Sequence, residues 1–264
     1  MELDLQVVNA FVTEQAFSGN PAAVCVLDAF LDDALMQQIA AQNNLSETAF
    51  IVAEGEHFHL RWFTPNVEVD LCGHATLASA FVLFEQDSKR DEIHFHSRSG
   101  QLSAKRRGSQ IQLNFPALQP TTIDLIAEVH SVFGIAPQAT YIADDVVAVF
   151  NNVSEIRALS PKLEILRTLP GRGLVATAQV SAEDKLQCDF VSRWFGPKVS
   201  VNEDPVTGSA HCALVPYWQQ QLQQHQFIAR QLSPRGGLLH CELIGERVYL
   251  SGHAQRYLHG KVNF

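Results

Sequence analysis

The chain has 264 residues, enough for one large domain or for two domains of about 130 residues each. Hydrophobic residues make up 46% and charged residues 18%, with no compositionally biased tract, so a folded protein is expected rather than a disordered one. The net charge is −9, and the basic cluster at residues 105–107 precedes Gly108 at an expected hairpin tip. These features argue against a nucleic-acid partner.

The N-terminus has neither a basic start nor a long apolar run, and no stretch reaches the roughly 18 apolar residues that span a bilayer. We therefore expect no signal peptide and no membrane partner. The cysteines are odd in number and lack CxxC spacing: Cys25, Cys72, Cys188, Cys212 and Cys241. This pattern favours free thiols in a reducing cytoplasm.

In chain order, the first half is predicted to contain two helices among several strands. Apolar or alternating runs predict strands at 5–12, 23–27, 45–52, 57–65, 93–97, 101–105 and 110–115. Apolar residues at helical spacing predict a helix over 31–44, and the small, apolar residues after Gly73 predict a second helix. The strand at 45–52 leaves Glu47 near its start, among small and apolar neighbours.

The second half follows a crossing segment at 116–120, which places the lobes at 1–117 and 118–264, with the last residues free to return to the first lobe. Strands are predicted at 139–142, 145–150, 173–178 and 188–195. Helices are predicted at 123–133, at 153–166 with a break before Pro161, and after Gly208. The order indicates an α+β fold with mixed sheets that each wrap a helix, and neither GxGxxG nor GxxxxGK is present.

One stretch occurs twice. RWFTPNVEV at 61–69 returns as RWFGPKVSV at 193–201, an offset of 132 residues, and each copy leads into a small-residue turn and a helix. This offset aligns Cys72 with Asp204. Two further matches share an offset of 137 residues: 97–102 with 234–239, and 111–115 with 248–252. The repeats predict two homologous lobes related by a pseudo-twofold axis, with both helix starts, near Gly73 and Gly208, facing one cleft and able to bind an anion.

Four motifs in a fixed order support a family resemblance: SGNPAAV at 18–24, SETAF at 46–50, RWFTP with CGHAT at 61–76, and EDPVTGSA at 203–210. The chain resembles the PhzF-like family over nearly its full length. The resemblance implies a diaminopimelate epimerase-like fold, with two lobes that are each a β-barrel-like sheet around a central helix and an active site between them. It also implies acid/base isomerisation without a cofactor, and homodimers.

Carried over by motif, the resemblance assigns catalytic roles to Glu47, His74 and Asp204. Substrate contacts fall on Asn20, Ser46, Cys72, Gly73, Thr207, Gly208 and Ser209. The chain departs from the phenazine enzyme at Cys72, where that enzyme has a small apolar residue. It departs from the diaminopimelate epimerases at Asp204, where they have a second cysteine.

Each catalytic candidate also has a structural interpretation. Glu47 is a base whose pKa is raised by partial burial, or an exposed glutamate at a strand end. His74 is a neutral imidazole beside a helix dipole, or a capping or core histidine. Asp204 points into a shared cleft, or caps the second helix. Cys72 is a low-pKa thiolate at a helix start, or an ordinary buried cysteine.

We therefore expect an isomerase or epimerase that moves a proton on a small carboxylate-bearing metabolite, with no cofactor and no metal. His57 and His59 lie on one strand face, but no third ligand follows at a useful spacing. The alternative is a catalytically silent PhzF-like binding or protein-interaction module. The substrate's identity is not encoded in any motif.

Overall fold

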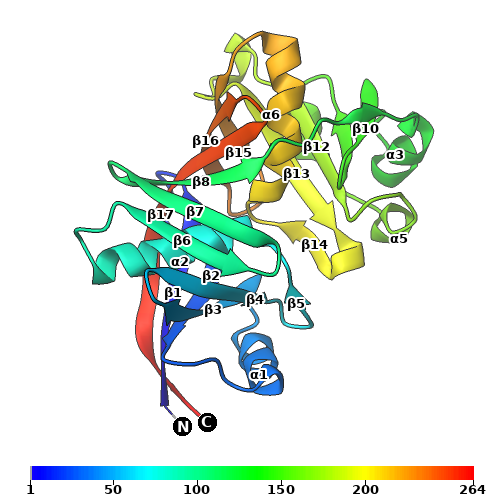
Figure 1. The fold of residues 1–264 in the computed structure, drawn as a ribbon. Helices are drawn as coiled ribbons and strands as arrows, with labels where there is room; N and C mark the ends of the chain where they lie inside the picture. Colours follow the sequence, from blue (N-terminus) through cyan, green and yellow to red (C-terminus); the bar gives the residue numbers. More distant parts are fainter. Residues whose placement is uncertain (1) are drawn as a thin grey trace. The chain divides into compact units, whose positions relative to one another are not determined.

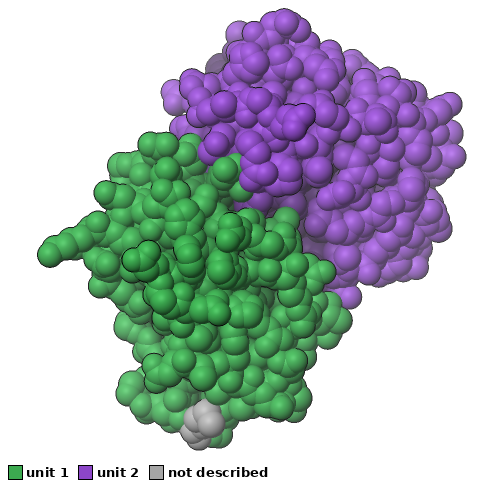
Figure 2. Space-filling view, in the orientation of Figure 1, with its two compact units in different colours: residues 1–114, 251–264 green, residues 115–250 purple. Residues whose placement is uncertain are grey.

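The computed structural model describes residues 2–264, which form two compact units. Unit 1 contains the residues up to 114 together with 251–264, and unit 2 contains residues 115–250; Figure 2 distinguishes them by colour. Among the helices that the structure describes, none is both long enough and apolar enough to cross a membrane.

Unit 1 contains two helices, α1 (Asp33–Asn43) and α2 (Gly73–Gln86). Its strands are β1 (Glu2–Val12), β2 (Asn20–Leu27), β3 (Glu47–Glu54), β4 (His57–Phe63), β5 (Glu68–Val69), β6 (Glu92–Ser97), β7 (Gly100–Arg107), β8 (Gln110–Pro116) and the later part of β17 (Arg247–Asn263).

These strands close on themselves. β1 and β2 pair antiparallel, β2 and β3 parallel, β3 and β4 antiparallel, and β4 and β6 parallel. β6, β7 and β8 continue as antiparallel neighbours, and β8 pairs with β17, which pairs with β1. The order of pairing therefore returns to its first strand, as in a barrel, and leaves no free edge between β1 and β8.

Helix α2 is the core of unit 1 and packs against β1, β2, β3 and β7 (Figure 1). Nearly all of its residues are buried, because small and apolar side chains occupy every face of the helix. Helix α1 instead buries one stripe, including Met36 and Ile39, against Phe50 and Phe63. The side chain of Asp32 accepts a hydrogen bond from the Ala34 N–H and begins α1.

Unit 2 contains the helices α3 (Ile126–Phe133), α4 (Val153–Ala158), α5 (Leu163–Leu166) and α6 (Gly208–Leu222), with the 3-10 turns η1 (Ala182–Asp184) and η2 (Pro197–Val199). Its strands are β9 (Thr121–Thr122), β10 (Ala139–Ile142), β11 (Val146–Val149), β12 (Leu174–Gln179), β13 (Phe190–Gly196), β14 (Val201–Asp204), β15 (Gln226–Gln231), β16 (Gly237–Ile244) and the start of β17.

The pairing pattern of unit 2 repeats that of unit 1. β10 and β11 pair antiparallel, β11 and β12 parallel, β12 and β13 antiparallel, β13 and β15 parallel, and β15 and β16 antiparallel. The repeated RWF motif lies in β4 in one unit and in β13 in the other. Both arginines make the same paired contact with a glutamate: Arg61 with Glu68 and Arg193 with Glu203.

The predicted α+β fold with two homologous barrel-like units is confirmed, and most predicted elements lie close to their observed positions. The helix predicted at 123–133 begins only at Ile126, because the backbone N–H groups of Ile123 and Leu125 bond to Thr140 of β10. The break predicted before Pro161 in the helical segment 153–166 is present, because α4 ends at Ala158 and α5 begins at Leu163. The strands β5 and β9 were not predicted, because two residues carry no periodicity. No strand was predicted after residue 195, where β14, β15, β16 and β17 lie.

Candidate active site

The start of α2 places two of the predicted site residues side by side. Cys72 is the N-cap residue in an extended conformation, Gly73 is the first helical residue and His74 is the second. The side chains of Cys72 and His74 are both buried. The Cys72 Sγ atom lies 3.5 Å from His74 Nδ1 and 4.0 Å from Nε2.

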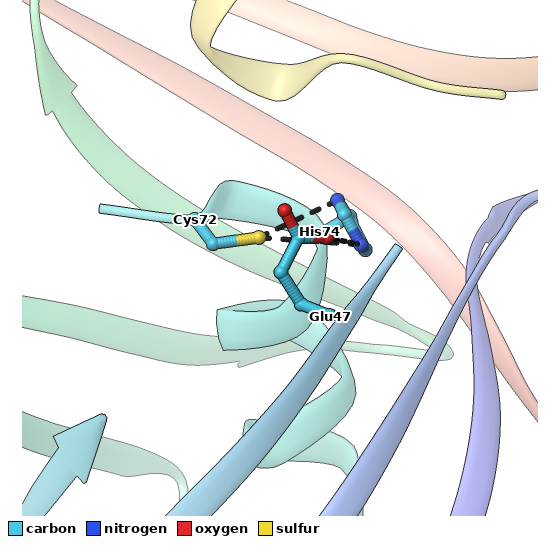
Figure 3. Close-up of side chains that lie close together, drawn as sticks. All are labelled: Glu47, Cys72 and His74. Carbon is cyan, nitrogen blue, oxygen red and sulfur yellow. Dashed lines mark hydrogen bonds and ion pairs between the residues drawn. The ribbon is translucent and has the colours of Figure 1, made fainter. Parts of the chain in front are cut away.

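Glu47, the first residue of β3, reaches the same histidine. Its Oε2 atom lies 2.9 Å from His74 Nε2, and the Glu47 side chain keeps 14% of its surface exposed. Although this distance is that of an ion pair, Oε2 accepts no aligned hydrogen bond from any residue that the structure describes. Figure 3 shows Glu47, Cys72 and His74 pointing toward one another from β3 and the start of α2. The Glu47 Oε2 atom is thus buried, lies within ion-pair distance of His74, and has a lone pair available to accept a proton.

Asn20 and Ser46 orient the imidazole from its other side. The Ser46 hydroxyl donates to Asn20 Oδ1 at 3.0 Å, so the amide nitrogen of Asn20 faces His74 Nδ1 at 3.1 Å. An amide nitrogen is a donor, and Nδ1 therefore acts as the acceptor. When the imidazole is neutral, its proton therefore lies on Nε2, on the side of Glu47; when it is charged, the Asn20 amide must turn so that its oxygen accepts from Nδ1.

Charges around His74 decide its protonation. Burial opposes a charge on the imidazole, but the neighbouring Cys72 and Glu47 outweigh burial and raise the pKa of His74 well above its ordinary value. Burial raises the pKa of the Cys72 thiol to about 11, helped by the Glu47 charge. The thiol is thus neutral at neutral pH, which leaves Glu47 as the source of the raised pKa of His74.

The structure argues against one of the two interpretations given for each of His74 and Cys72. The helix dipole does not keep His74 easily neutral, because the Glu47 carboxylate lies closer to the imidazole than the diffuse charge of the helix end. Cys72 is not a low-pKa thiolate, because the helix start cannot compensate for its burial.

In unit 2 the start of α6 carries different chemistry. Thr207 is the N-cap residue, and Gly208 and Ser209 are the first two helical residues. The Thr207 hydroxyl donates to Asp204 Oδ2 at 2.5 Å, and both residues are buried. The amide of Gln231 donates to the Asp204 carbonyl at 2.8 Å and accepts from the Thr207 N–H at 2.9 Å, which holds the turn before α6.

The alignment of Cys72 with Asp204 is wrong. Trp62 pairs with Val69, seven residues later, whereas Trp194 pairs with Asp204, ten residues later. Three additional residues thus lie between Trp194 and Asp204, in the segment that contains η2, so the repeat offset changes from 132 to 135 there. Asp204 is therefore the counterpart of Val69, and the N-cap Thr207 is the counterpart of Cys72.

Sequence reasoning missed Arg172, which lies against Ser209 in unit 2. Its guanidinium donates from Nη2 to the Ser209 hydroxyl at 3.0 Å and binds both carboxylate oxygens of Asp145. Trp194 donates its indole N–H to the same Asp145 at 2.8 Å. The signal in the sequence was weak, an arginine between two glycines before an apolar strand.

The predicted site residues thus form two local groups. In unit 1, Asn20, Ser46, Glu47 and Cys72 converge on His74, with Gly73 as the first residue of α2. In unit 2, Asp204 bonds to Thr207, and Ser209, next to Gly208, bonds to Arg172. Among the described residues, one cluster combines nitrogen, sulfur and carboxylate oxygen donors close enough to share a metal ion: Glu47, Cys72 and His74, whose donor atoms lie within 4.8 Å of one another.

Comparison with known proteins gives a consistent result. Residues 8–260 match the family model described as phenazine biosynthesis-like protein. An uncharacterised isomerase of Pseudomonas aeruginosa is 47% identical, with 100% of each chain aligned. A phenazine biosynthesis-like domain-containing protein of mouse is 41% identical over 98% of this chain and 99% of its own.

Solved structures agree with the observed fold. A PhzF-family protein of Enterococcus faecalis superposes with a TM-score of 0.95 at 42% identity, with 100% of each chain covered. A hydroxyproline epimerase of Agrobacterium vitis superposes with a TM-score of 0.64 at 9% identity, covering 99% of this chain and 92% of its own. The second likeness is one of fold alone.

Proposed function

Because the chain belongs to the phenazine biosynthesis-like (PhzF) family, we propose that it is an isomerase that moves a proton on a small carboxylate-bearing metabolite without a cofactor. The contact between Glu47 and His74 at the start of α2 carries this proposal. Proton transfer at carbon needs a base within reach of the substrate and a group that returns the proton. Close relatives named as isomerases are consistent with this reaction class.

Glu47 is the proposed base. Its Oε2 atom would take a proton from a carbon next to an electron-withdrawing group, and the C–H electron pair would pass into the conjugated system of the substrate. The same carboxyl group would return the proton to another carbon, or to the other face of the same carbon, so that no electrons are gained or lost overall. The partial exposure of the Glu47 side chain supports access by a small molecule.

His74 is the proposed partner of that base. Asn20 fixes its orientation, and its Nε2 atom lies 2.9 Å from Glu47 Oε2, so a small turn of either side chain lets it stabilise the carboxylate before transfer and share the proton afterwards. The first backbone N–H groups of α2 donate no capping hydrogen bond to the Cys72 side chain. They are therefore suited to stabilise negative charge that develops on the substrate.

Solvent exchange tests the proposed function directly. The protein is incubated in D₂O with a panel of small amino, hydroxy and unsaturated carboxylic acids, and deuterium incorporation is followed by mass spectrometry. We expect at least one acid to gain one deuterium at a carbon-bound position, at a rate that depends on Glu47. A protein that exchanges none of them while still binding one would instead be the catalytically silent module.

A further inference from the structure

We propose that Glu47, Cys72 and His74 form an inhibitory site for Zn²⁺. The three side chains offer one carboxylate oxygen, one sulfur and one imidazole nitrogen, and these atoms lie within 4.8 Å of one another. Binding of the ion depends only on this geometry. Its inhibitory effect rests on the proposed function, because the metal would occupy the base and its partner.

The separations between donor atoms fit a tetrahedral ion. Zinc binds sulfur at about 2.3 Å and imidazole nitrogen or carboxylate oxygen at about 2.0–2.2 Å, so neighbouring ligands around it lie roughly 3.4–3.6 Å apart. Cys72 Sγ is 4.0 Å from His74 Nε2, and that nitrogen is 2.9 Å from Glu47 Oε2. These two separations need shifts of about half an ångström. The separation of Cys72 Sγ from the Glu47 carboxylate, at most 4.8 Å, needs a shift of up to about 1.3 Å.

The three donor atoms, a sulfur, an imidazole nitrogen and a carboxylate oxygen, determine which metal ions can bind. A thiolate with an imidazole suits zinc and related transition metals, whereas Mg²⁺ and Ca²⁺ prefer a site made of oxygen ligands. A thiolate and a carboxylate together carry two negative charges, which the divalent ion neutralises. The occupied centre is therefore uncharged overall, which suits its burial. On binding, the thiol proton leaves for solvent, and the imidazole proton moves from Nε2 to Nδ1, so the imidazole stays neutral.

Asn20 and Ser46 can support the occupied site as well as the empty one. With the metal on Nε2, the imidazole proton moves to Nδ1 and needs an acceptor. Rotation of the Asn20 amide would present its oxygen to Nδ1 and its nitrogen to the Ser46 hydroxyl, which can accept. A carbonyl oxygen that holds the second nitrogen of a ligating histidine is a frequent feature of metal sites.

Cobalt is the probe for the site, because Co²⁺ replaces zinc and its bond to a thiolate adds a sulfur-to-metal absorption band. The metal-free protein is titrated with Co²⁺ and then with Zn²⁺. We expect one Co²⁺ per chain with the sulfur band, loss of the band on addition of Zn²⁺, and loss of deuterium exchange at the same Zn²⁺ concentration.

Two variants and a matched control locate the ligands. Cys72→Ser should abolish the sulfur band, and Glu47→Gln should keep the band but weaken Co²⁺ binding at least tenfold. Cys188→Ser, which changes a partly exposed cysteine in unit 2, should leave both unchanged. Circular dichroism confirms that each variant is folded.

The outcomes separate the metal site from the proposed function. The metal-site proposal is overturned if the wild-type protein shows no sulfur band, or if the band persists in Cys72→Ser. Either result counts even if deuterium exchange is found. Imidazole-only binding at the surface histidines His57, His94 and His96 would give no sulfur band and counts against the site. A sulfur band that depends on Cys72 in a protein without exchange establishes the metal site and removes the proposed function. If deuterium exchange continues in the zinc-loaded protein, the ion binds without inhibiting the reaction.

Discussion

The starts of α2 and α6 occupy equivalent positions in their units and carry opposite chemistry. At α2 a carboxylate, Glu47, lies against the imidazole of His74, the second helical residue. At α6 a guanidinium, Arg172, lies against the hydroxyl of Ser209, again the second helical residue. We propose that the first helix start moves a proton and that the second binds an anion.

The strand registers show why the two starts differ. Phe63 pairs with Thr48, and Phe195 pairs with Leu174, so the counterpart of Glu47 in unit 2 is Gly173 and that of Ser46 is Arg172. A side chain at Gly173 would begin 2.6 Å from the Phe195 carbonyl oxygen and 2.8 Å from the Trp194 ring. No glutamate fits there, and unit 2 places its charged residue one position earlier.

The largest effect is expected for substitution of Glu47, the proposed base. Glu47→Gln keeps the shape of the side chain but cannot take up a proton, so we expect the deuterium-exchange rate to fall roughly 100- to 10,000-fold. Substrate binding should change little. Glu54→Gln, at the exposed end of the same strand, is the matched control and should be fully active. A fully active Glu47→Gln protein would contradict the assignment of the base.

A second prediction concerns the arginine of the RWF motif, which is present in both units. Arg193 binds Glu203 and also donates to the Ile156 and Leu159 carbonyls, whereas Arg61 binds Glu68 and the exposed Asp33. Arg193→Met should therefore lower the free energy of unfolding by about 3–4 kcal/mol, because it leaves a carboxylate and two buried carbonyls without a donor.

The matched variant for Arg193→Met is Arg61→Met, which should cost less because it leaves no buried carbonyl unpaired. Urea denaturation of both variants measures the difference. Equal losses would mean that the two carbonyl contacts add no stability.

A third prediction uses the histidine of α6. His211 is fully buried, and burial lowers its pKa from 6.5 to about 4, with one hydrogen bond to the Thr207 carbonyl. Because the unfolded chain binds this proton more readily, stability should be complete above pH 6.5 and be lost as pH falls toward 4. The loss amounts to at most about 3 kcal/mol. His211→Gln should flatten this part of the stability profile, and an unchanged slope would exclude the effect.

A smaller effect is expected for substitution of Arg172, beside the start of α6. Arg172→Gln removes the charge beside Ser209 but keeps a group that can donate to its hydroxyl, so we expect KM for a carboxylate substrate to rise about tenfold with little change in kcat. Arg167→Gln, in an exposed ion pair, is the control and should not change KM. A fall in kcat at constant KM would give Arg172 a different role.

The smallest effect is expected at Cys72. Its thiol is neutral at neutral pH, because its pKa is about 11, so it is not equipped to serve as a base in place of Glu47. Cys72→Ser should change the exchange rate by less than about tenfold. Steady-state rates of the variant, measured with a chelator present, check this, and an inactive Cys72→Ser protein would favour a racemase that uses the thiol.

The sequence predicts the backbone elements better than it predicts the electrostatics of the site. Period and motif order predict most strands before residue 196, both buried helices and the residues around His74, because hydrophobic pattern and turn residues act locally. The strands β14 to β17 were not predicted. The alignment of Cys72 with Asp204 failed because a constant-offset comparison does not detect the three-residue insertion between Trp194 and Asp204. Arg172 and the raised pKa of His74 could not be predicted, because both depend on contacts between residues distant in the sequence.

The return of β17 to unit 1 has a consequence for synthesis on the ribosome. β1 pairs with β17 from Leu3 with Val262 to Ala10 with Ala254, although β17 is made only after all of unit 2. Until then β1 has β2 on one side and an unpaired edge on the other, the kind of edge that other strands can join. Unit 2 can therefore complete its core first, while the half of the molecule that begins the chain is the last to be finished.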